Sequence, residues 1–514
     1  MPSLNWIGKE KVINHHQDVP CKILKKSYTF NNSSSENMII HGDNLEVLKS
    51  LLPKFDGQID FIYIDPPYNT GNEGWVYNDN VNHPSINKWI GHVVGENDDL
   101  SRNDKWLCMM YPRLKLAYKL LKNSGVMFIS IDDNVQPFLK LICCEIFGNS
   151  NVEQYIWCLQ DKSEGSFVKT AGLTVRKEHE YILACFKSSG FKFNKYIGER
   201  NFSNDGYSNP DNDPRGPWFS GNISRNGIKS TTGSKYYAIT NPAGETFLRN
   251  WTLSKEEYEE ALKDNRIYFS KGGAGVPRLK IFQSVSSELI QSSLFTDVHT
   301  SITGKNQLKK LFDGKSPFNF PKPTTLIERL LKIASSENAL VLDFFAGSGT
   351  TAHAVLNVNN EENSNRRFIE IEMMDYAETI TAERIKRVIS GYGGNKGIKG
   401  DFSFYELGES LFNDDGTINT NIDIIELKKY IYYTETKQEL ENENKPFLGE
   451  FNNTCYYLFY DKDESYCLNT KLLSEIKNKS EWYVIYADTC SLSEDYMKKF
   501  NIIFKKIPRD IIKY

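Results

Sequence analysis

The stretch that decides the fold is IDFIYIDPPYNTG, residues 59–71. Its first six residues form a largely apolar run bounded by Gly57 and by two prolines, which is typical of a central strand in a parallel sheet. The tetrapeptide Asp65-Pro66-Pro67-Tyr68 therefore lies at the carboxyl end of this strand. Because the two prolines fix φ and remove backbone donors, the sequence predicts a rigid, prebuilt turn there.

Strand and helix patterns alternate on both sides of this strand. A short strand over residues 37–44 is followed by Leu45, Leu48, Leu51 and Leu52 at helical spacing. Similar periodicity predicts helices over residues 105–121, 142–147 and 324–334, and strands over 126–131, 153–159, 180–186, 339–344 and 367–371. The predicted fold class is α/β, with a sheet completed from both sides of the chain's middle.

The chain is long enough for several domains, because 514 residues exceed what one hydrophobic core usually organises. Between residues 188 and 315 the pattern breaks into short strands and polar turns, which indicates an inserted domain. Beyond residue 400 a Tyr-rich, acidic segment with strand-like runs at 455–460 and 482–487 indicates an accessory domain. We expect four segments, 1–187, 188–315, 316–400 and 401–514, of which the first and third form one domain.

Composition places the chain among globular proteins. It is 39% hydrophobic and 25% charged, and it contains no run of 18 apolar residues, so we expect no membrane span. The first ten residues do not resemble a secretory signal, and nine cysteines lie scattered without a CxxC pair. These features predict a cytoplasmic protein with reduced thiols.

Charge is distributed unevenly along the chain. The whole sequence has a net charge of -4, whereas residues 151–332 contain 26 Lys and Arg against 19 Asp and Glu, a net +7. Nucleic-acid phosphates bind to locally basic surfaces, so the middle of the chain is the part that we expect to contact nucleic acid. A solvated surface with scattered charge is the alternative interpretation.

A glycine loop follows the predicted strand at 339–344. The segment VLDFFAGSGTTA, residues 341–352, enters a Gly-x-Gly-x-x-Ala turn that opens a helix, and glycines there permit close backbone approach to a nucleoside. Glu370 and Glu372 end the next strand, where a carboxylate would accept hydrogen bonds from ribose hydroxyls. A dinucleotide oxidoreductase or a plain helix-capping turn would show the same pattern. A P-loop is excluded at this position because no Gly-Lys-Ser/Thr follows.

The tetrapeptide at residues 65–68 fits methyl transfer to an exocyclic amine of an aromatic base. Such an amine is a poor nucleophile, so catalysis needs acceptors for both N–H groups that turn the nitrogen lone pair toward the methyl donor. The Asp65 carboxylate and the Pro66 carbonyl supply two acceptors, and Tyr68 offers a face for stacking on the base. On its own, this tetrapeptide would indicate only a rigid turn after a strand. Together with the glycine loop, it indicates methylation of an amine.

These motifs resemble those of the β-class amino-methyltransferases. The residues that carry the resemblance are Gly42-Asp43-Asn44-Leu45, Asp65-Pro66-Pro67-Tyr68-Asn69-Thr70-Gly71 and Asp343-Phe344-Phe345-Ala346-Gly347-Ser348-Gly349-Thr350-Thr351. Their order is similar to that of the modification subunit of type III restriction-modification systems. The resemblance implies a circularly permuted Rossmann-like fold that uses S-adenosyl-L-methionine, with an inserted target-recognition domain and a C-terminal α+β accessory domain.

The resemblance covers residues 37–186 and 318–390 and implies site residues. Lys322-Pro323-Thr324 resembles the family's contact to the methionine carboxylate, a task for a cation and a helix N-terminus. Residues 177–183 resemble the strand that closes the pocket, in which His179 either supports the pocket or, as we favour, is a satisfied core histidine. The implied catalytic residues are Asp65, Pro66, Pro67 and Tyr68, and no metal is implied. The implied cofactor-binding residues are Asp43, Asp65, Lys322, Pro323, Thr324, Asp343, Phe344, Phe345, Ala346, Gly347, Gly349, Thr350, Glu370 and Glu372. Glu372 departs from the glutamine pattern of type III relatives, and the chain is somewhat short for that group.

The resemblance implies methylation of adenine N6 in duplex DNA after base flipping. Cytosine-N4 methylation is the nearest competing reaction, although that family usually has Ser in place of Asp65. A protein or RNA methyltransferase, an orphan regulatory methyltransferase and a DNA-recognition scaffold for a nuclease-helicase partner also stay open. The implied partners are double-stranded DNA, a second copy of the chain as a homodimer, and a restriction (helicase-nuclease) subunit that residues 401–514 would dock.

Overall fold

The computed structural model describes most of the chain. The described residues are 3–69, 88, 101–159, 177–194, 196–198, 206–225, 232–282, 287–289, 292–413, 415–438, 440 and 445–511. The motif residues Thr70 and Gly71 lie outside them. The chain divides into two compact units, one made of Met1–Asn194 with Ser292–Tyr514 and the other of Lys195–Gln291.

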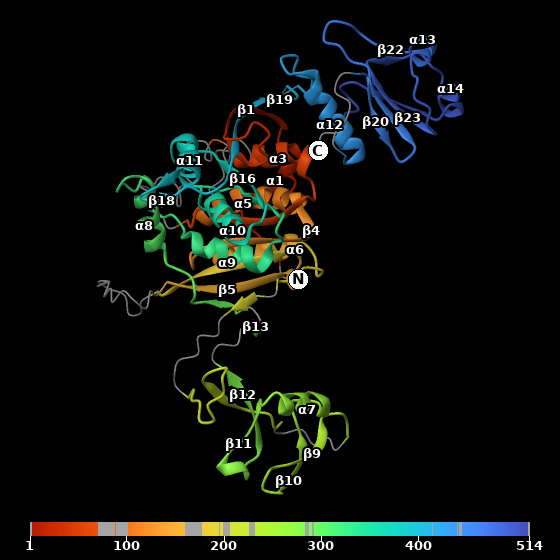
Figure 1. Cartoon of the computed structure of the whole chain (residues 1–514). Coiled ribbons are helices and arrows are strands. Elements are labelled where there is room, and N and C mark those ends of the chain that lie inside the picture. The colour runs from red at the N-terminus through yellow and green to blue at the C-terminus, as the bar shows by residue number, and fades with distance from the viewer. Residues whose placement is uncertain are drawn as a thin grey trace. The chain divides into compact units, whose positions relative to one another are not determined.

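A large sheet organises the first unit (Figure 1). Its central strands run parallel in the order β2 (Met38–His41), β16 (Arg367–Glu372), β15 (Leu340–Asp343), β3 (Ile59–Ile64) and β4 (Leu121–Ile131). Beyond β4 lie antiparallel β6 (His179–Phe186), then β5 (Val152–Cys158) and β14 (Leu294–Phe295). Beyond β2 lie β19 (Phe402–Ser410) and β1 (Lys22–Phe30).

Strands from both sides of the second unit interleave in this sheet. β15 and β16, which follow residue 291 in the chain, lie between β2 and β3, which precede residue 195. The catalytic-motif strand β3 thus pairs directly with the glycine-loop strand β15. This order confirms the predicted permuted arrangement.

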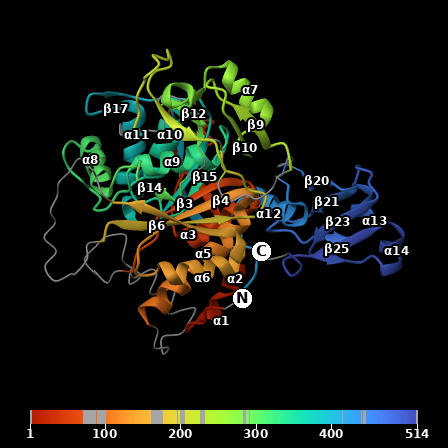
Figure 2. The same cartoon turned by 90° about the horizontal axis from the view of Figure 1, so that it is seen from below.

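Helices cover both faces of the sheet (Figure 2). One layer contains α3 (Asn44–Phe55), α5 (Arg102–Leu120) and α6 (Gln136–Phe147), and the other contains α9 (Thr324–Ala334), α10 (Thr350–Glu362) and α11 (Glu383–Ser390). The apolar faces of α3 and α5 join the sheet in one core that includes Leu48, Trp106 and Ile62. The result is a three-layer Rossmann-like fold, as predicted.

The second unit has a core of its own. A sheet of β8 (Trp218–Asn222), β12 (Pro277–Phe282) and β11 (Ile267–Phe269) adjoins a hairpin of β9 (Tyr236–Thr240) and β10 (Thr246–Asn250) and helix α7 (Lys255–Lys263). Trp251 and Ile239 are buried among them. At its ends, β7 (Tyr196–Gly198) pairs antiparallel with β13 (Ser287–Leu289). Residues 292–315, expected in the inserted domain, belong instead to the first unit and include β14 and helix α8 (Ser301–Leu311).

The C-terminal segment forms a smaller sheet of β20 (Phe447–Phe451), β21 (Thr454–Leu458), β23 (Trp482–Ala487) and β25 (Ile502–Lys506). Helix α12 (Ile424–Thr436) contributes Tyr430 and Ile431 to its core.

Short elements complete the described chain: α1 (Lys9–Val12), α2 (His15–Asp18), η1 (Asn149–Asn151), η2 (Lys271–Gly273), η3 (Asp375–Ala377), η4 (Glu378–Ala382), β17 (Gly391–Tyr392), β18 (Asn395–Lys396), β22 (Cys467–Leu468), α13 (Thr470–Ser474), β24 (Thr489–Cys490) and α14 (Glu494–Lys499). Strand β19, just past the expected boundary at residue 400, belongs to the large sheet rather than to this one. No helix in the described part is both long and apolar enough to cross a membrane.

Candidate active site

Carboxylates gather at one edge of the large sheet. Asp43 follows β2, Glu372 ends β16, Asp343 ends β15 and Asp65 follows β3. Because these strands are parallel, their carboxyl ends share the edge at which open α/β sheets bind ligands. Strand β6 runs antiparallel to β4, so its first residues reach the same edge and bring Glu180 there.

Lys322 holds Asp65 in place. Its Nζ donates to both carboxylate oxygens at 2.8 Å and lies 3.9 Å from Glu180 Oε2. The Lys322 side chain is only 5% exposed. Burial acts to lower the pKa of Lys322, but the charges of Asp65 and Glu180 outweigh it and raise that pKa. The surroundings of Lys322 therefore favour its charged ammonium form.

The rest of the tetrapeptide is fixed by hydrogen bonds. Tyr68 donates its hydroxyl to Glu180 Oε2 at 3.0 Å, and its ring lies 4.7 Å from Lys322 Nζ. Trp106, on α5, donates Nε1–H to the Pro67 carbonyl at 2.7 Å. Burial raises the pKa of both Tyr68 and Glu180. The predicted rigid turn is thus tied to a helix, to a neighbouring strand and to Lys322.

The glycine loop forms the facing wall. Gly347 and Gly349 have φ of 54° and 76°, a left-handed backbone that favours glycine. Asp343 accepts from the Phe345 amide at 3.0 Å and from the Thr351 hydroxyl at 2.5 Å, and burial raises its pKa to about 7.

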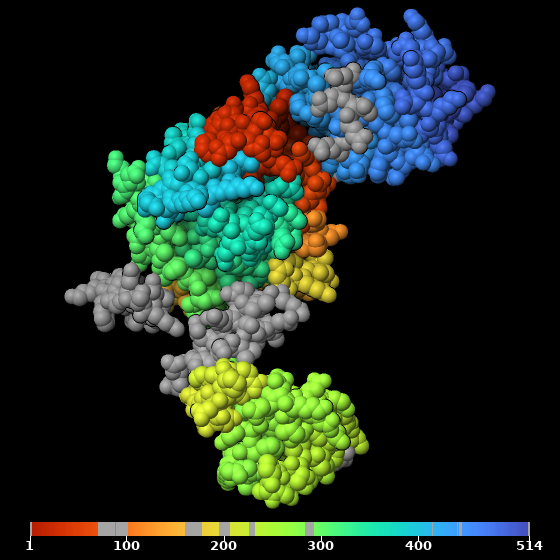
Figure 3. Space-filling view, viewed as in Figure 1, coloured from red at the N-terminus to blue at the C-terminus, as the bar shows by residue number. Residues whose placement is uncertain are grey.

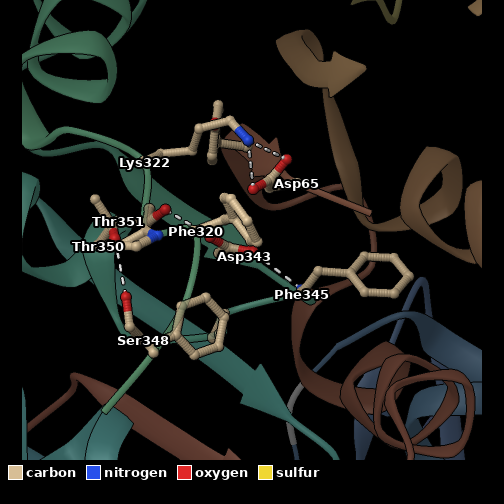
Figure 4. Close-up of a pocket in the computed structure, with 13 residues that line it drawn as sticks. Asp65, Phe320, Lys322, Asp343, Phe345, Ser348, Thr350 and Thr351 are labelled. Atoms are coloured by element: carbon tan, nitrogen blue, oxygen red, sulfur yellow. Dashed lines mark hydrogen bonds and ion pairs between the residues drawn. The ribbon is translucent and has the colours of Figure 1, made fainter. Parts of the chain in front are cut away.

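A pocket lies between the tetrapeptide and this loop, as Figure 4 shows. Asp65 and Lys322 meet on one side of it, and Asp343, Phe345 and Ser348 come from β15 and the loop. Its lining residues are Tyr63, Asp65, Phe318, Phe320, Pro321, Lys322, Asp343, Phe345, Ala346, Gly347, Ser348, Thr350 and Thr351. Two sequence motifs almost 280 residues apart therefore line one cavity.

The two expected ribose ligands, Glu370 and Glu372, are both buried, and neither lines the pocket. Glu370 is fully buried behind the loop, where Oε1 accepts from the Ala352 amide at 2.7 Å, and burial raises its pKa to about 8. Glu372 accepts from the Gly347 amide at 2.8 Å and from the Met374 amide at 3.0 Å. Glu370 thus supports the helix start, whereas Glu372 supports the loop itself.

The remaining expected residues lie around the pocket rather than on its lining. Asp43 caps α3 by accepting from the Leu45 amide at 2.8 Å, and the Phe344 carbonyl accepts from Asn44 Nδ2 at 2.7 Å. Pro323 caps α9, and Thr324 Oγ1 accepts from Gln307 on α8 at 3.1 Å. The His179 ring packs edge-on against Tyr181.

Sequence reasoning missed three contributors. It considered His179 mainly as a core histidine and gave the adjacent Glu180 no role, whereas Glu180 is the residue that contacts Tyr68 and Lys322. It also left out Phe318 and Phe320, which line the pocket ahead of Lys322. Recognising that the strand at residues 180–186 runs antiparallel to its neighbour would have placed Glu180 at the site. Among the described residues, no three His, Cys, Asp or Glu side chains are grouped as around a metal ion.

Comparison with known proteins gives consistent matches. A family model described as DNA methylase matches residues 59–383. The chain is 36% identical to the Mod subunit of the type III restriction-modification enzyme StyLTI from Salmonella typhimurium, over 71% of this chain and 57% of that subunit. It is 30% identical to the EcoP15I Mod subunit of Escherichia coli, over 72% of this chain and 64% of that subunit. It is also 30% identical to the type II methyltransferase M.KpnI of Klebsiella pneumoniae, over 68% of this chain and 85% of that enzyme.

The chain spans about three fifths of the length of the two Mod subunits. On the extent of the family match and the M.KpnI coverage, the chain belongs to the DNA methylase family.

Proposed function

We propose that this chain transfers a methyl group from S-adenosyl-L-methionine to N6 of adenine in duplex DNA, at a specific site. The observation that carries the proposal is the shared pocket, in which Asp65 of the Asp-Pro-Pro-Tyr turn faces the glycine loop after β15. Membership of the DNA methylase family supports the reaction type.

The pocket's chemistry fits S-adenosyl-L-methionine. A buried cation, Lys322, suits its carboxylate, and the aromatic rings of Phe318, Phe320 and Phe345 suit its adenine ring. Glu372, at the end of β16, is the carboxylate we assign to the ribose hydroxyls. When bound, this cofactor supplies a methyl group activated on a sulfonium.

The acceptor groups for the target amine come from the tetrapeptide. A carboxylate offers about four lone-pair positions, and Lys322 uses one on each oxygen of Asp65, so acceptor capacity remains. We assign one amine N–H to Asp65 and the other to the Pro66 carbonyl, which turns the nitrogen lone pair toward the methyl. Tyr68 stacks on the base after it is flipped out of the duplex, and Pro67 holds the turn. The surplus proton leaves the nitrogen to Asp65 or to water.

The other parts of the chain have assigned roles in this proposal. The Lys195–Gln291 unit, with its own core, acts in target recognition. Residues 401–514 dock a second copy of the chain as a homodimer or a helicase-nuclease restriction subunit. The similarity to two type III Mod subunits supports the restriction partner.

The experiment that tests the reaction compares Asp65→Ala with the wild-type chain. We expect loss of methyl transfer with retained S-adenosyl-L-methionine binding, because Asp65 acts on the amine. Glu337→Gln, which removes a carboxylate from an exposed position of the same unit, is the control and keeps activity. Turnover retained by Asp65→Ala would refute the assignment. Mass spectrometry of nucleosides from the methylated DNA identifies the product, and N4-methylcytosine there would replace adenine as the target.

A further inference from the structure

Helix α8 has two chemically different faces. Gly304, Leu308 and Leu311 are buried on one face. The opposite face exposes Lys305, Lys309 and Lys310, and Lys315 is exposed just after the helix. The helix lies at the periphery of its unit in Figure 1, and its green surface is uncovered in Figure 3.

The buried face of α8 is fastened to the wall of the pocket. Gly304 packs so closely on the backbone of Pro321 and Lys322 that a Cβ at residue 304 would lie 2.9 Å from the Lys322 carbonyl carbon. Gln307 donates to Thr324 Oγ1 at 3.1 Å and accepts from the Thr324 amide at 3.3 Å. At the other end, Arg387 of α11 donates to the Leu311 carbonyl at 2.7 Å. The helix is therefore rigidly connected to the segment that presents Lys322 to Asp65.

The lysines of α8 are not engaged with carboxylates. In the part of the chain that the structure describes, Lys305, Lys309, Lys310 and Lys315 form no ion pair, whereas Lys332 nearby is paired with Glu361 at 2.7 Å. Residues 292–332 contain seven Lys and Arg against three Asp and Glu, while 195–291 contain thirteen against eleven. The basic character of the chain's middle is thus concentrated around α8 rather than in the Lys195–Gln291 unit.

We propose that the lysine face of α8, formed by Lys305, Lys309 and Lys310, binds the phosphate backbone of duplex DNA next to the target base. This inference rests on the proposed function. Lysines free of carboxylate partners release counterions when they meet phosphates, which is the main source of affinity for DNA. A base that enters the pocket leaves its flanking phosphates at the pocket's mouth, beside the segment to which α8 is fastened. Contacts of this kind position the duplex and do not read its sequence.

The test is the triple variant Lys305→Ala, Lys309→Ala and Lys310→Ala in the full chain. Alanine preserves helix propensity, and the three side chains are exposed, so we expect an unchanged melting temperature and unchanged S-adenosyl-L-methionine binding. The dissociation constant for a duplex carrying the methylated site is measured at several salt concentrations. Because each phosphate contact contributes about 0.9 to the slope of log K against log salt, the slope should fall by about 2 to 3. At the lowest salt concentration, affinity should fall at least roughly tenfold.

Two matched variants separate this site from general charge. Replacing the exposed Lys25, Lys26 and Lys54 of β1 and α3 by Ala removes the same charge and should keep the wild-type slope. Replacing the three α8 lysines by Arg should also keep it. An unchanged slope in the α8 alanine variant, or an equal fall in the control alanine variant, overturns the inference while leaving the proposed function intact. If the α8 alanine variant still binds DNA like wild type but no longer binds an acidic protein partner, the inference is overturned and the lysine face binds that partner instead. A wild-type chain without salt-sensitive affinity for duplex DNA refutes the proposed function itself, and this inference with it.

Discussion

Lys322 is a single buried cation beside two partly buried carboxyl groups, and it shapes the electrostatics of the pocket. Its Nζ is 2.8 Å from both oxygens of Asp65 and 3.9 Å from Glu180. A buried charge is tolerated only with such partners, because desolvation costs several kcal/mol per ion. The acceptor turn is therefore coupled energetically to the segment that precedes α9.

Removing this cation should unbalance the site. Lys322→Met leaves Asp65 and Glu180 without their shared partner, so we expect the free energy of unfolding to fall by about 3 to 5 kcal/mol. Adding Glu180→Gln removes one of the two charges and should recover about 1 to 2 kcal/mol of it. Urea denaturation of the wild type, both single variants and the double variant measures the coupling. Strict additivity of the two substitutions would contradict it.

The carboxyl of Glu370 should make stability depend on pH. Burial raises its pKa to about 8, whereas an unfolded chain ionises glutamate near pH 4.3. The folded state therefore binds this proton more tightly than the unfolded state does. The resulting contribution to the free energy of unfolding is fully present below about pH 4 and is lost as the pH rises toward about 8. Glu370→Gln keeps an oxygen for the Ala352 amide and cannot ionise. The unfolding free energy of Glu370→Gln minus that of wild type should thus increase by up to about 1.4 kcal/mol for each pH unit between pH 5 and 8.

Urea denaturation at each pH measures this difference. Glu337→Gln, at an exposed glutamate, is the control and should show a constant offset from wild type. Parallel pH profiles for Glu370→Gln and wild type would show that the buried carboxyl does not titrate as expected.

At the residue scale, the sequence predicted the motif residues but not their contacts. Asp65, Gly347 and Phe345 were expected at one site because strand ends can be located from apolar runs, and they line one pocket. Glu180 was missed because strand direction is set by tertiary pairing, which periodicity does not encode. The ion pair of Lys322 with Asp65 was likewise not predicted, because the motifs place both residues at the site without giving the direction of their side chains.

At the element scale, α8 depends on a glycine that ordinary helix propensity disfavours. In a solvent-exposed helix, a Gly→Ala substitution such as Gly304→Ala would increase stability by about 1 kcal/mol. Here the added Cβ would collide with the backbone of Pro321 and Lys322, so we expect destabilisation by about 1 to 3 kcal/mol and weaker methyl transfer. Thermal unfolding and a transfer assay measure both. Asn306→Ala, on the exposed face, should be neutral or stabilising, and a stabilised Gly304→Ala would show that the helix is free to move.

Element boundaries were predictable where local chemistry determines them. Helix α9 begins at Thr324 and ends at Ala334, as expected, because the proline before it and the apolar spacing are local signals. The strand expected to begin at residue 126 begins instead at Leu121, directly after α5, but residues 122–125 interrupt its pairing with β3 between Leu121 and Val126. Gly125 lies within β4, where a Cβ would be 3.0 Å from the Ile59 and Asp60 carbonyls. This glycine therefore also serves close strand packing, a tertiary requirement that the sequence pattern does not show.

At the scale of the whole molecule, the Lys195–Gln291 unit should be removable. Its entry and exit strands pair, with Gly198 opposite Ser287, and its core is its own. Replacing residues 199–286 by a short Gly-Ser turn should leave a folded first unit that binds S-adenosyl-L-methionine. Site-specific methylation should be lost, because the proposed recognition unit is gone. Calorimetry and sequencing of methylated DNA measure the two properties, and retained site specificity would move recognition to the first unit.

The interleaved sheet also has a consequence for how the chain is made. β2 and β3 leave the ribosome early, but the strands that separate them, β15 and β16, are synthesised only after residue 339. Until then each has an edge without its native neighbour, the kind of edge that invites pairing with another chain. We therefore expect a dependence on chaperones that bind nascent chains. A ribosome stalled before residue 339 would hold an aggregation-prone half, whereas one stalled with residues 1–410 outside the exit tunnel would hold a nearly complete sheet.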